Sequence, residues 1–192
     1  MSINKLDQLA IADKASELFI RRGYTNTSLS EIGQACGVLK GSLYHHFENK
    51  EHLLLFILER LRSDLNNYVF CIADNKDLSP AERLKQINAF LQDYFLEKKA
   101  CLIAMMGMEA ELISEDARKI LHSIFKDWKQ TYVKIFKNYH TPYMADVHAT
   151  NSIIYIEGAI VWMRITQENL PLKRAFKSIE QNLQALEHGN TN

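Results

Sequence analysis

The amino-acid sequence predicts an all-α protein with about nine helices. Gly (7) and Pro (3) are sparse among the 192 residues, so the chain has few turns, as helical proteins do. Apolar residues recur every three or four positions through most of the chain, and no segment shows the alternation typical of a strand. Hydrophobic residues make up 47% of the chain, which is enough to bury a substantial core.

Four helices are predicted in the first 71 residues. The first ends at Gly23, and Thr27 or Ser28 can cap a short second helix that stops at Gly37. A third short helix follows, and Asn49 is a suitable N-cap for a long fourth helix. These helices cover about residues 11–22, 28–36, 39–46 and 50–71.

The remaining helices are bounded by caps and turns. Ser79 and Glu82 can form a capping box, and Pro80 fits the first helical position between them. "HTPY" interrupts the helical pattern, and the helix after it is apolar on most sides, so more than one of its faces should be covered. The predicted helices cover about residues 80–98, 101–112, 114–139, 145–166 and 171–187.

Composition limits the class of protein. The net charge is zero, and residues 1–50 contain six Lys or Arg against five Asp or Glu, so a nucleic acid would be bound through placed contacts more than bulk charge. The three widely spaced cysteines suit a reducing compartment and form no metal or disulfide pattern. No apolar run reaches transmembrane length, and the first residues have no signal-peptide core. We therefore expect a soluble cytoplasmic protein without a metal or cofactor.

Residues 27–54, "TSLSEIGQACGVLKGSLYHHFENKEHLL", predict a helix-turn-helix. Gly33 is small where the second helix must approach, and Gly37 can adopt the left-handed conformation of the turn. The outer side of the second short helix then presents Lys40, Gly41, Ser42, Tyr44 and His45, groups that can reach phosphates and base edges in a major groove. The alternative is an ordinary helical hairpin with core aromatics, which we expect for Phe47 alone. The coincidence of small residues, turn and polar face favours DNA binding.

Residues 11–54, "IADKASELFIRRGYTNTSLSEIGQACGVLKGSLYHHFENKEHLL", resemble the DNA-binding domain of the TetR family of transcriptional regulators. The resemblance implies a homodimeric repressor whose C-terminal helices bind a small effector. The family usually has Ala at Gly33, and Ser or Thr at Leu39. Because Leu cannot cap a helix, we expect Leu39 to make an apolar contact, such as one to a thymine methyl. By position, the resemblance implies DNA contacts from Thr27, Ser28, Lys40, Ser42, Tyr44, His45 and Lys50.

The C-terminal part carries many Met and aromatic side chains, which can line a cavity for a hydrophobic ligand. Each of them can instead belong to an ordinary core, and Glu109 and Glu157, which lie in apolar sequence, can point to solvent or cap a neighbour. The segments "ACLIAMMGMEAELISEDARKIL" and "IEGAIVWMRIT" also resemble a subgroup of the family whose effectors include aromatic and drug-like compounds. The predicted ligand-binding residues are Tyr94, Met105, Met108, Glu109, Trp128, Tyr132, Tyr155 and Trp162.

Together these observations predict a DNA-binding domain at residues 1–50 and a ligand-binding and dimerisation domain at 51–192. The helices at about 145–166 and 171–187 should pair with their symmetry mates, so that the dimer binds a near-palindromic operator. The sequence leaves open which effector releases the operator, and whether binding represses or activates. The alternatives are a helical partner- or ligand-binding protein without DNA binding and, far less supported, an enzyme. No nucleophile motif or metal-ligand pair favours the enzyme.

Overall fold

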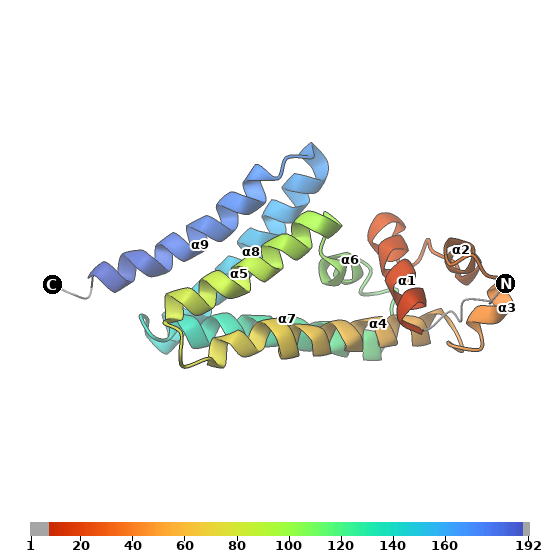
Figure 1. Ribbon diagram of the computed structural model, residues 1–192, viewed down its shortest axis with the longest axis horizontal. Coiled ribbons are helices and arrows are strands. Elements are labelled where there is room, and N and C mark those ends of the chain that lie inside the picture. The colour runs from red at the N-terminus through yellow and green to blue at the C-terminus, as the bar shows by residue number, and fades with distance from the viewer. Residues whose placement is uncertain (1–7, 190–192) are drawn as a thin grey trace. The chain divides into compact units, whose positions relative to one another are not determined.

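The computed structural model describes the backbone of residues 8–189 and the side chains of residues 8–183. Within that part of the chain it contains nine α-helices and no strand, which confirms the predicted fold class (Figure 1). The chain forms two compact units. The first unit comprises the described residues up to 63 together with 102–123, and the second comprises 64–101 and the described residues from 124 onward.

The first unit contains six helical segments around one apolar core. It includes α6 and the first part of α7 although they are far from the other helices in sequence, and α6 packs against α1. Ile11, Phe19, Ile32, Leu43 and Phe47 are almost completely buried, so Phe47 is a core residue as expected. The segments are α1 (Gln8–Arg22), α2 (Leu29–Ala35), α3 (Lys40–Leu43), α4 (Lys50–Asp64), α6 (Leu102–Met108) and the start of α7 (Glu115–Phe136).

Two glycines provide the turns of the helix-turn-helix. Gly37 has a φ of +70°, the left-handed conformation predicted for the turn between α2 and α3. Gly33 is needed for a different reason: a Cβ at this position would lie 3.0 Å from the Val38 carbonyl oxygen and 3.4 Å from the Lys40 nitrogen. The usual Ala of the family would therefore crowd the turn, and glycine lets it pass close to α2.

The fourth helix is shorter than predicted. Asn49 caps it, since its Oδ1 accepts a hydrogen bond from the His52 nitrogen at 2.8 Å. The α-helix ends at Asp64, however, and the chain continues as a π-helix (Leu65–Val69) and a 3₁₀-helix (Phe70–Asp74). Asn66 and Asn67 occupy this segment, and asparagine side chains compete with the helical backbone for hydrogen bonds. The change also coincides with the boundary between the two units.

The second unit is built from long helices. α5 (Pro80–Lys98) begins with the predicted capping box of Ser79 and Glu82, and both α5 and α8 (Pro142–Thr166) pack against α9 (Leu170–Gly189). The predicted start of α8 at 145 was wrong, because Thr141 caps the helix and Pro142 takes its first position. α7 ends at Phe136 instead of residue 139, and a turn at 137–139 precedes "HTPY", within which α8 begins. α6 is also shorter than its predicted span of 101–112.

Among the described residues, no helix has the length and hydropathy needed to span a membrane. The predicted domain boundary at residue 50 stays a prediction. The compact units divide the chain differently, because residues 102–123 lie with the N-terminal helices.

Candidate nucleic-acid interface

One face of the helix-turn-helix is polar and open to solvent. Lys40, Gly41, Ser42, Tyr44 and His45 are all exposed, since Leu43 holds the opposite side of α3 in the core. The Lys40 ammonium lies 5.8 Å from the centre of the Tyr44 ring, so the cation and the phenol are neighbours on this face. These five residues are the set predicted to face a major groove, and none of them lies in the core.

Leu39 is also exposed, with 83% of its surface open to solvent. It occupies the N-cap position of α3, and its side chain makes no capping hydrogen bond, as the sequence implied. A large apolar side chain that is mostly exposed at the edge of a polar face is suited to contact another molecule. Its exposure is consistent with the expected contact to a thymine methyl.

Thr27 and Ser28 differ in their availability to DNA. The Thr27 side chain is 1% exposed, and its hydroxyl donates a hydrogen bond to the Gly23 carbonyl oxygen at 2.7 Å. Ser28 is exposed but forms a capping box with Glu31, which begins α2. The side chain of Thr27 therefore holds the loop between α1 and α2, whereas Ser28 remains accessible at the end of a helix.

The Lys50 ammonium bonds to backbone carbonyl oxygens of the protein. The Nζ donates to the carbonyl oxygens of Tyr24 at 2.8 Å, Thr27 at 2.9 Å and Thr25 at 3.4 Å, and lies 4.2 Å from the centre of the Tyr24 ring. Burial lowers the pKa of this group, although the nearby carboxylates of Glu109 and Glu31 oppose the shift. An ammonium has three donors, and all three are directed at the protein. The geometry thus gives Lys50 a structural role and does not favour the predicted phosphate contact.

Glu109 lies in the same loop, where sequence reasoning did not expect it. Its carboxylate accepts hydrogen bonds from the backbone nitrogens of Tyr24 and Thr25, each at 2.7 Å, and from the Thr25 hydroxyl. Burial tends to raise the pKa of Glu109, but these hydrogen bonds and the Lys50 charge outweigh it and hold the pKa below its usual value. Glu109 is therefore an ionised partner of the α1–α2 loop, and no local sequence signal identified that loop as its partner.

The predicted ligand-binding residues do not form one group. Met105, Met108 and Glu109 belong to the first unit, and Met108 is 86% exposed. Trp128 and Tyr132 are completely buried in the second unit. The remaining three residues also lie in the second unit: Tyr94 is partly buried, and Tyr155 and Trp162 are exposed on α8.

The core of the second unit contains buried polar atoms. The Tyr132 hydroxyl donates to Asn88 Oδ1 at 2.6 Å, and Asn88 Nδ2 donates to Glu180 at 3.1 Å. Trp128 Nε1 lies beside the Tyr132 hydroxyl without forming a regular hydrogen bond, and Glu157 Oε1 is buried without a partner. Burial raises the pKa of Glu157, although a contact with the Cys101 thiol opposes the shift. Sequence reasoning missed Asn88, because a single Asn in an apolar stripe carries no signal of its partner.

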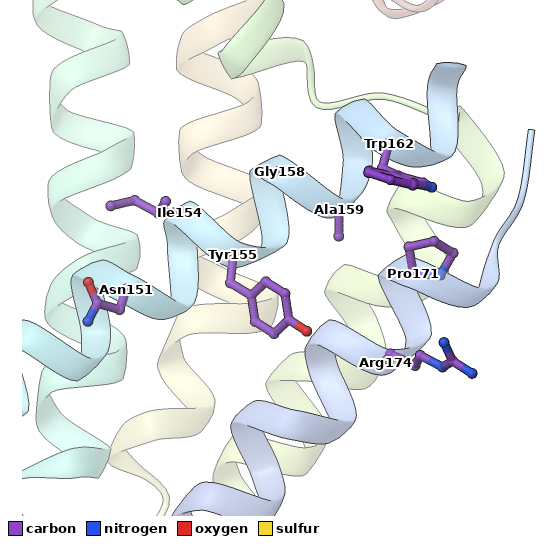
Figure 2. Close-up of a pocket in the computed structure, with 8 residues that line it drawn as sticks. All are labelled: Asn151, Ile154, Tyr155, Gly158, Ala159, Trp162, Pro171 and Arg174. Atoms are coloured by element: carbon purple, nitrogen blue, oxygen red, sulfur yellow. The ribbon is translucent and has the colours of Figure 1, made fainter. Parts of the chain in front are cut away.

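An open groove follows α8 and the start of α9 (Figure 2). Its volume is about 580 Å³. Tyr155 extends from α8 over the groove, and Pro171 and Arg174 border it from α9. We call this the α8–α9 groove; it is lined by Asn151, Ile154, Tyr155, Gly158, Ala159, Trp162, Pro171 and Arg174.

The exposed polar helix on a tight turn, followed by a second helical unit, defines a helix-turn-helix regulator. The family model described as bacterial regulatory proteins, tetR family, matches residues 11–57. The model described as the C-terminal domain of LmrA/YxaF-like transcriptional regulators matches residues 80–178, more than half of the chain. The protein therefore belongs to the TetR family of transcriptional regulators, as the resemblance in residues 11–54 implied.

Curated relatives and solved structures agree with this assignment. The transcriptional repressor DhaR of Mycobacterium sp. (strain GP1) is 29% identical over 168 residues, 84% of each chain. The regulator LmrA of Bacillus subtilis is 28% identical over 171 residues, 84% of this chain and 88% of its own. A TetR regulator from Legionella pneumophila has the same fold, with a TM-score of 0.83 over 94% of this chain and 99% of its own at 19% identity. The protein is a DNA-binding transcriptional regulator and not an enzyme.

Proposed function

We propose that this regulator is a repressor that binds a near-palindromic operator as a homodimer and releases it when a small, mostly apolar effector binds. The observation that carries the proposal is the solvent-exposed polar face of α3. Its side chains are not part of the core that holds the fold together. The names of relatives support the direction of regulation, since DhaR and KstR2 of Rhodococcus jostii, which matches over a shorter stretch, are both called repressors. Operator DNA lies in the cytoplasm, so the protein would act there.

The operator contacts come from α3 and its two flanks. Lys40 and Ser42 can hydrogen-bond base edges, Tyr44 and His45 can reach phosphates, and Leu39 can contact a thymine methyl. Gly41 leaves space for the DNA backbone, and Ser28 lies at the start of α2. In this proposal Thr27 and Lys50 position the loop, because their polar groups already bond within the protein.

The homodimer forms through α8 and α9. One side of α8 is buried in the second unit, but Ile154, Val161, Trp162 and Ile165 on its other side are each more than half exposed in the isolated chain. With the α8–α9 groove, these side chains form an apolar face that a second copy of the chain would cover. The same face on both copies would meet about a two-fold axis, as in an isologous interface. Tyr155 and Trp162 then serve dimerisation and not effector binding.

The effector site lies in the second unit, near Tyr94, Trp128 and Tyr132. Trp128 Nε1 and Glu157 Oε1 support this placement, since buried polar atoms without partners are costly unless something satisfies them. An effector with an apolar body and at least one polar group would satisfy either atom. It can release DNA only by binding the DNA-free form more tightly than the bound form. Met105, Met108 and Glu109 are not retained in this site.

The operator proposal is tested with duplex DNA from upstream of the protein's own gene. The protein should retard this duplex in a mobility-shift assay and protect two related half-sites about one helical turn apart in footprinting, because a dimer presents two α3 helices. A scrambled duplex of the same length is the control. Equal binding to both duplexes at physiological salt would contradict the proposal of a specific operator.

The effector proposal is tested with a thermal-shift screen of small aromatic and aliphatic compounds. A true effector should raise the melting temperature, quench tryptophan fluorescence and dissociate the operator complex. Replacing Trp128→Phe, which keeps an aromatic ring but removes the Nε1 donor, should weaken binding of an effector with a hydrogen-bond acceptor. Replacing Tyr68→Phe is the control, since Tyr68 is an exposed aromatic residue of the π-helical segment and belongs neither to the proposed effector site nor to the α8–α9 face. Equal weakening by both changes would argue against this location.

A further inference from the structure

The loop between α1 and α2 contains an anion-binding concavity that is already occupied. Gly23 has a φ of +85°, and the backbone N–H groups of Tyr24 and Thr25, which follow it, both donate to the Glu109 carboxylate. Successive amides after a left-handed residue commonly form such a concavity for an anion. A Cβ on Gly23 would lie 2.5 Å from Glu109 Oε1, so glycine serves both the backbone conformation and the approach of the carboxylate.

The carbonyl side of the same loop is held by the opposite charge. The Lys50 ammonium donates hydrogen bonds to the carbonyl oxygens of Tyr24, Thr25 and Thr27. The amides of the loop thus bond to an anion and its carbonyls to a cation, and the two charges attract each other. The backbone of residues 24–27 is therefore fixed from both sides by side chains that lie outside the loop.

These two side chains come from different parts of the sequence. Lys50 is the first residue of α4, within the region that matches the N-terminal family model, 11–57. Glu109 directly follows α6 and lies within the region that matches the C-terminal model, 80–178. α6 nevertheless packs on α1 in the first unit. The conformation of a loop in the N-terminal region thus depends on a carboxylate supplied by the C-terminal one.

We propose that Glu109 is a positioning residue for operator binding, which holds the α1–α2 loop so that α2 and α3 meet the DNA in the competent arrangement. Ser28 follows this loop directly and caps α2, and α2 packs on α3. Without the carboxylate, the amides of Tyr24 and Thr25 lose their partner and the loop can adopt other conformations. The apparent affinity for the operator then falls in proportion to the fraction of molecules that remain in the competent arrangement.

The test compares Glu109→Gln with Glu111→Gln, since Glu111 is an exposed carboxylate two residues away. The operator is a duplex selected in vitro with the parent protein. Glutamine keeps the size of Glu109 but has one oxygen for three donors, and its NH₂ group opposes the backbone N–H groups. We expect about tenfold weaker operator binding for Glu109→Gln, which corresponds to about 1.4 kcal/mol, and no change for Glu111→Gln. Circular dichroism of all three proteins should show the same helix content.

A second variant separates positioning from general destabilisation. Glu109→Ala empties the concavity, and acetate should then partly restore operator binding, relative to chloride at equal ionic strength, because a free carboxylate can occupy the same amides. The parent protein should gain nothing from acetate. Operator binding by Glu109→Gln at the parent's affinity, or no difference between acetate and chloride for a folded Glu109→Ala, would overturn the positioning role. If the parent itself selects no DNA sequence, the operator proposal fails as well.

Discussion

Replacing Trp162→Glu and Ile165→Glu together is expected to convert the protein from a dimer to a monomer and to remove high-affinity operator binding. The two side chains are 57% and 77% exposed in the isolated chain, so glutamate at these positions should leave the fold of one protomer intact. In a dimer through α8 and α9, four unpaired carboxylates would instead be buried, at a cost of several kcal/mol per ion. A monomer has one α3 helix and loses the gain of about 10²–10⁴-fold from binding two linked half-sites.

Sedimentation or light scattering measures the first effect. The parent should have twice the chain mass of 22.2 kDa at micromolar concentration, and the double variant should have the chain mass itself. Tyr68→Glu is the matched control, since Tyr68 is 70% exposed but lies in the π-helical segment and not in the α8–α9 groove. A double variant that remains dimeric, or a parent that is already monomeric, would show that this face is not the interface.

Changes in the exposed face of α3 should have the second largest effect. Lys40→Ala and Ser42→Ala should each cost about 1–3 kcal/mol on the best operator and alter the preferred sequence, because each removes a base-edge contact. Tyr44→Phe should weaken binding to all sequences by a similar ratio, because it removes only the phenol hydroxyl, which we assign to a phosphate. None of these side chains is part of the core, so the free energy of unfolding should change little.

The measurement is operator affinity by fluorescence anisotropy, against the selected operator and a set of single-base variants of it. Lys85→Ala is the control for loss of a lysine, since Lys85 is an exposed residue of α5 in the second unit. If the three α3 variants bind every duplex as the parent does, α3 does not enter the groove. A uniform loss for Lys40→Ala across all duplexes would instead move Lys40 from a base to a phosphate.

Much of the helix-turn-helix could be predicted because its signals are local. Ser28 and Asn49 cap α2 and α4 through bonds that span three residues, and Gly37 supplies a positive φ at the turn. The exposed side of α3 follows from helical periodicity once Leu43 is assigned to the core. The differences in the helix boundaries also have local causes, because the Asn pair after Asp64 and the cap at Thr141 change the helix ends without interrupting the apolar pattern.

The sequence by itself therefore determined the all-α fold, the family and the exposed polar face of α3, because periodicity, caps and turns act between residues a few positions apart. The tertiary structure alone decided which polar groups are free. Thr27 is buried, the Lys50 ammonium is occupied by three carbonyl oxygens, and Glu109 bonds to amides 84 and 85 residues earlier. It also separated the predicted ligand residues into two units. Such contacts depend on how helices pack, and the residue types involved are equally compatible with solvent exposure.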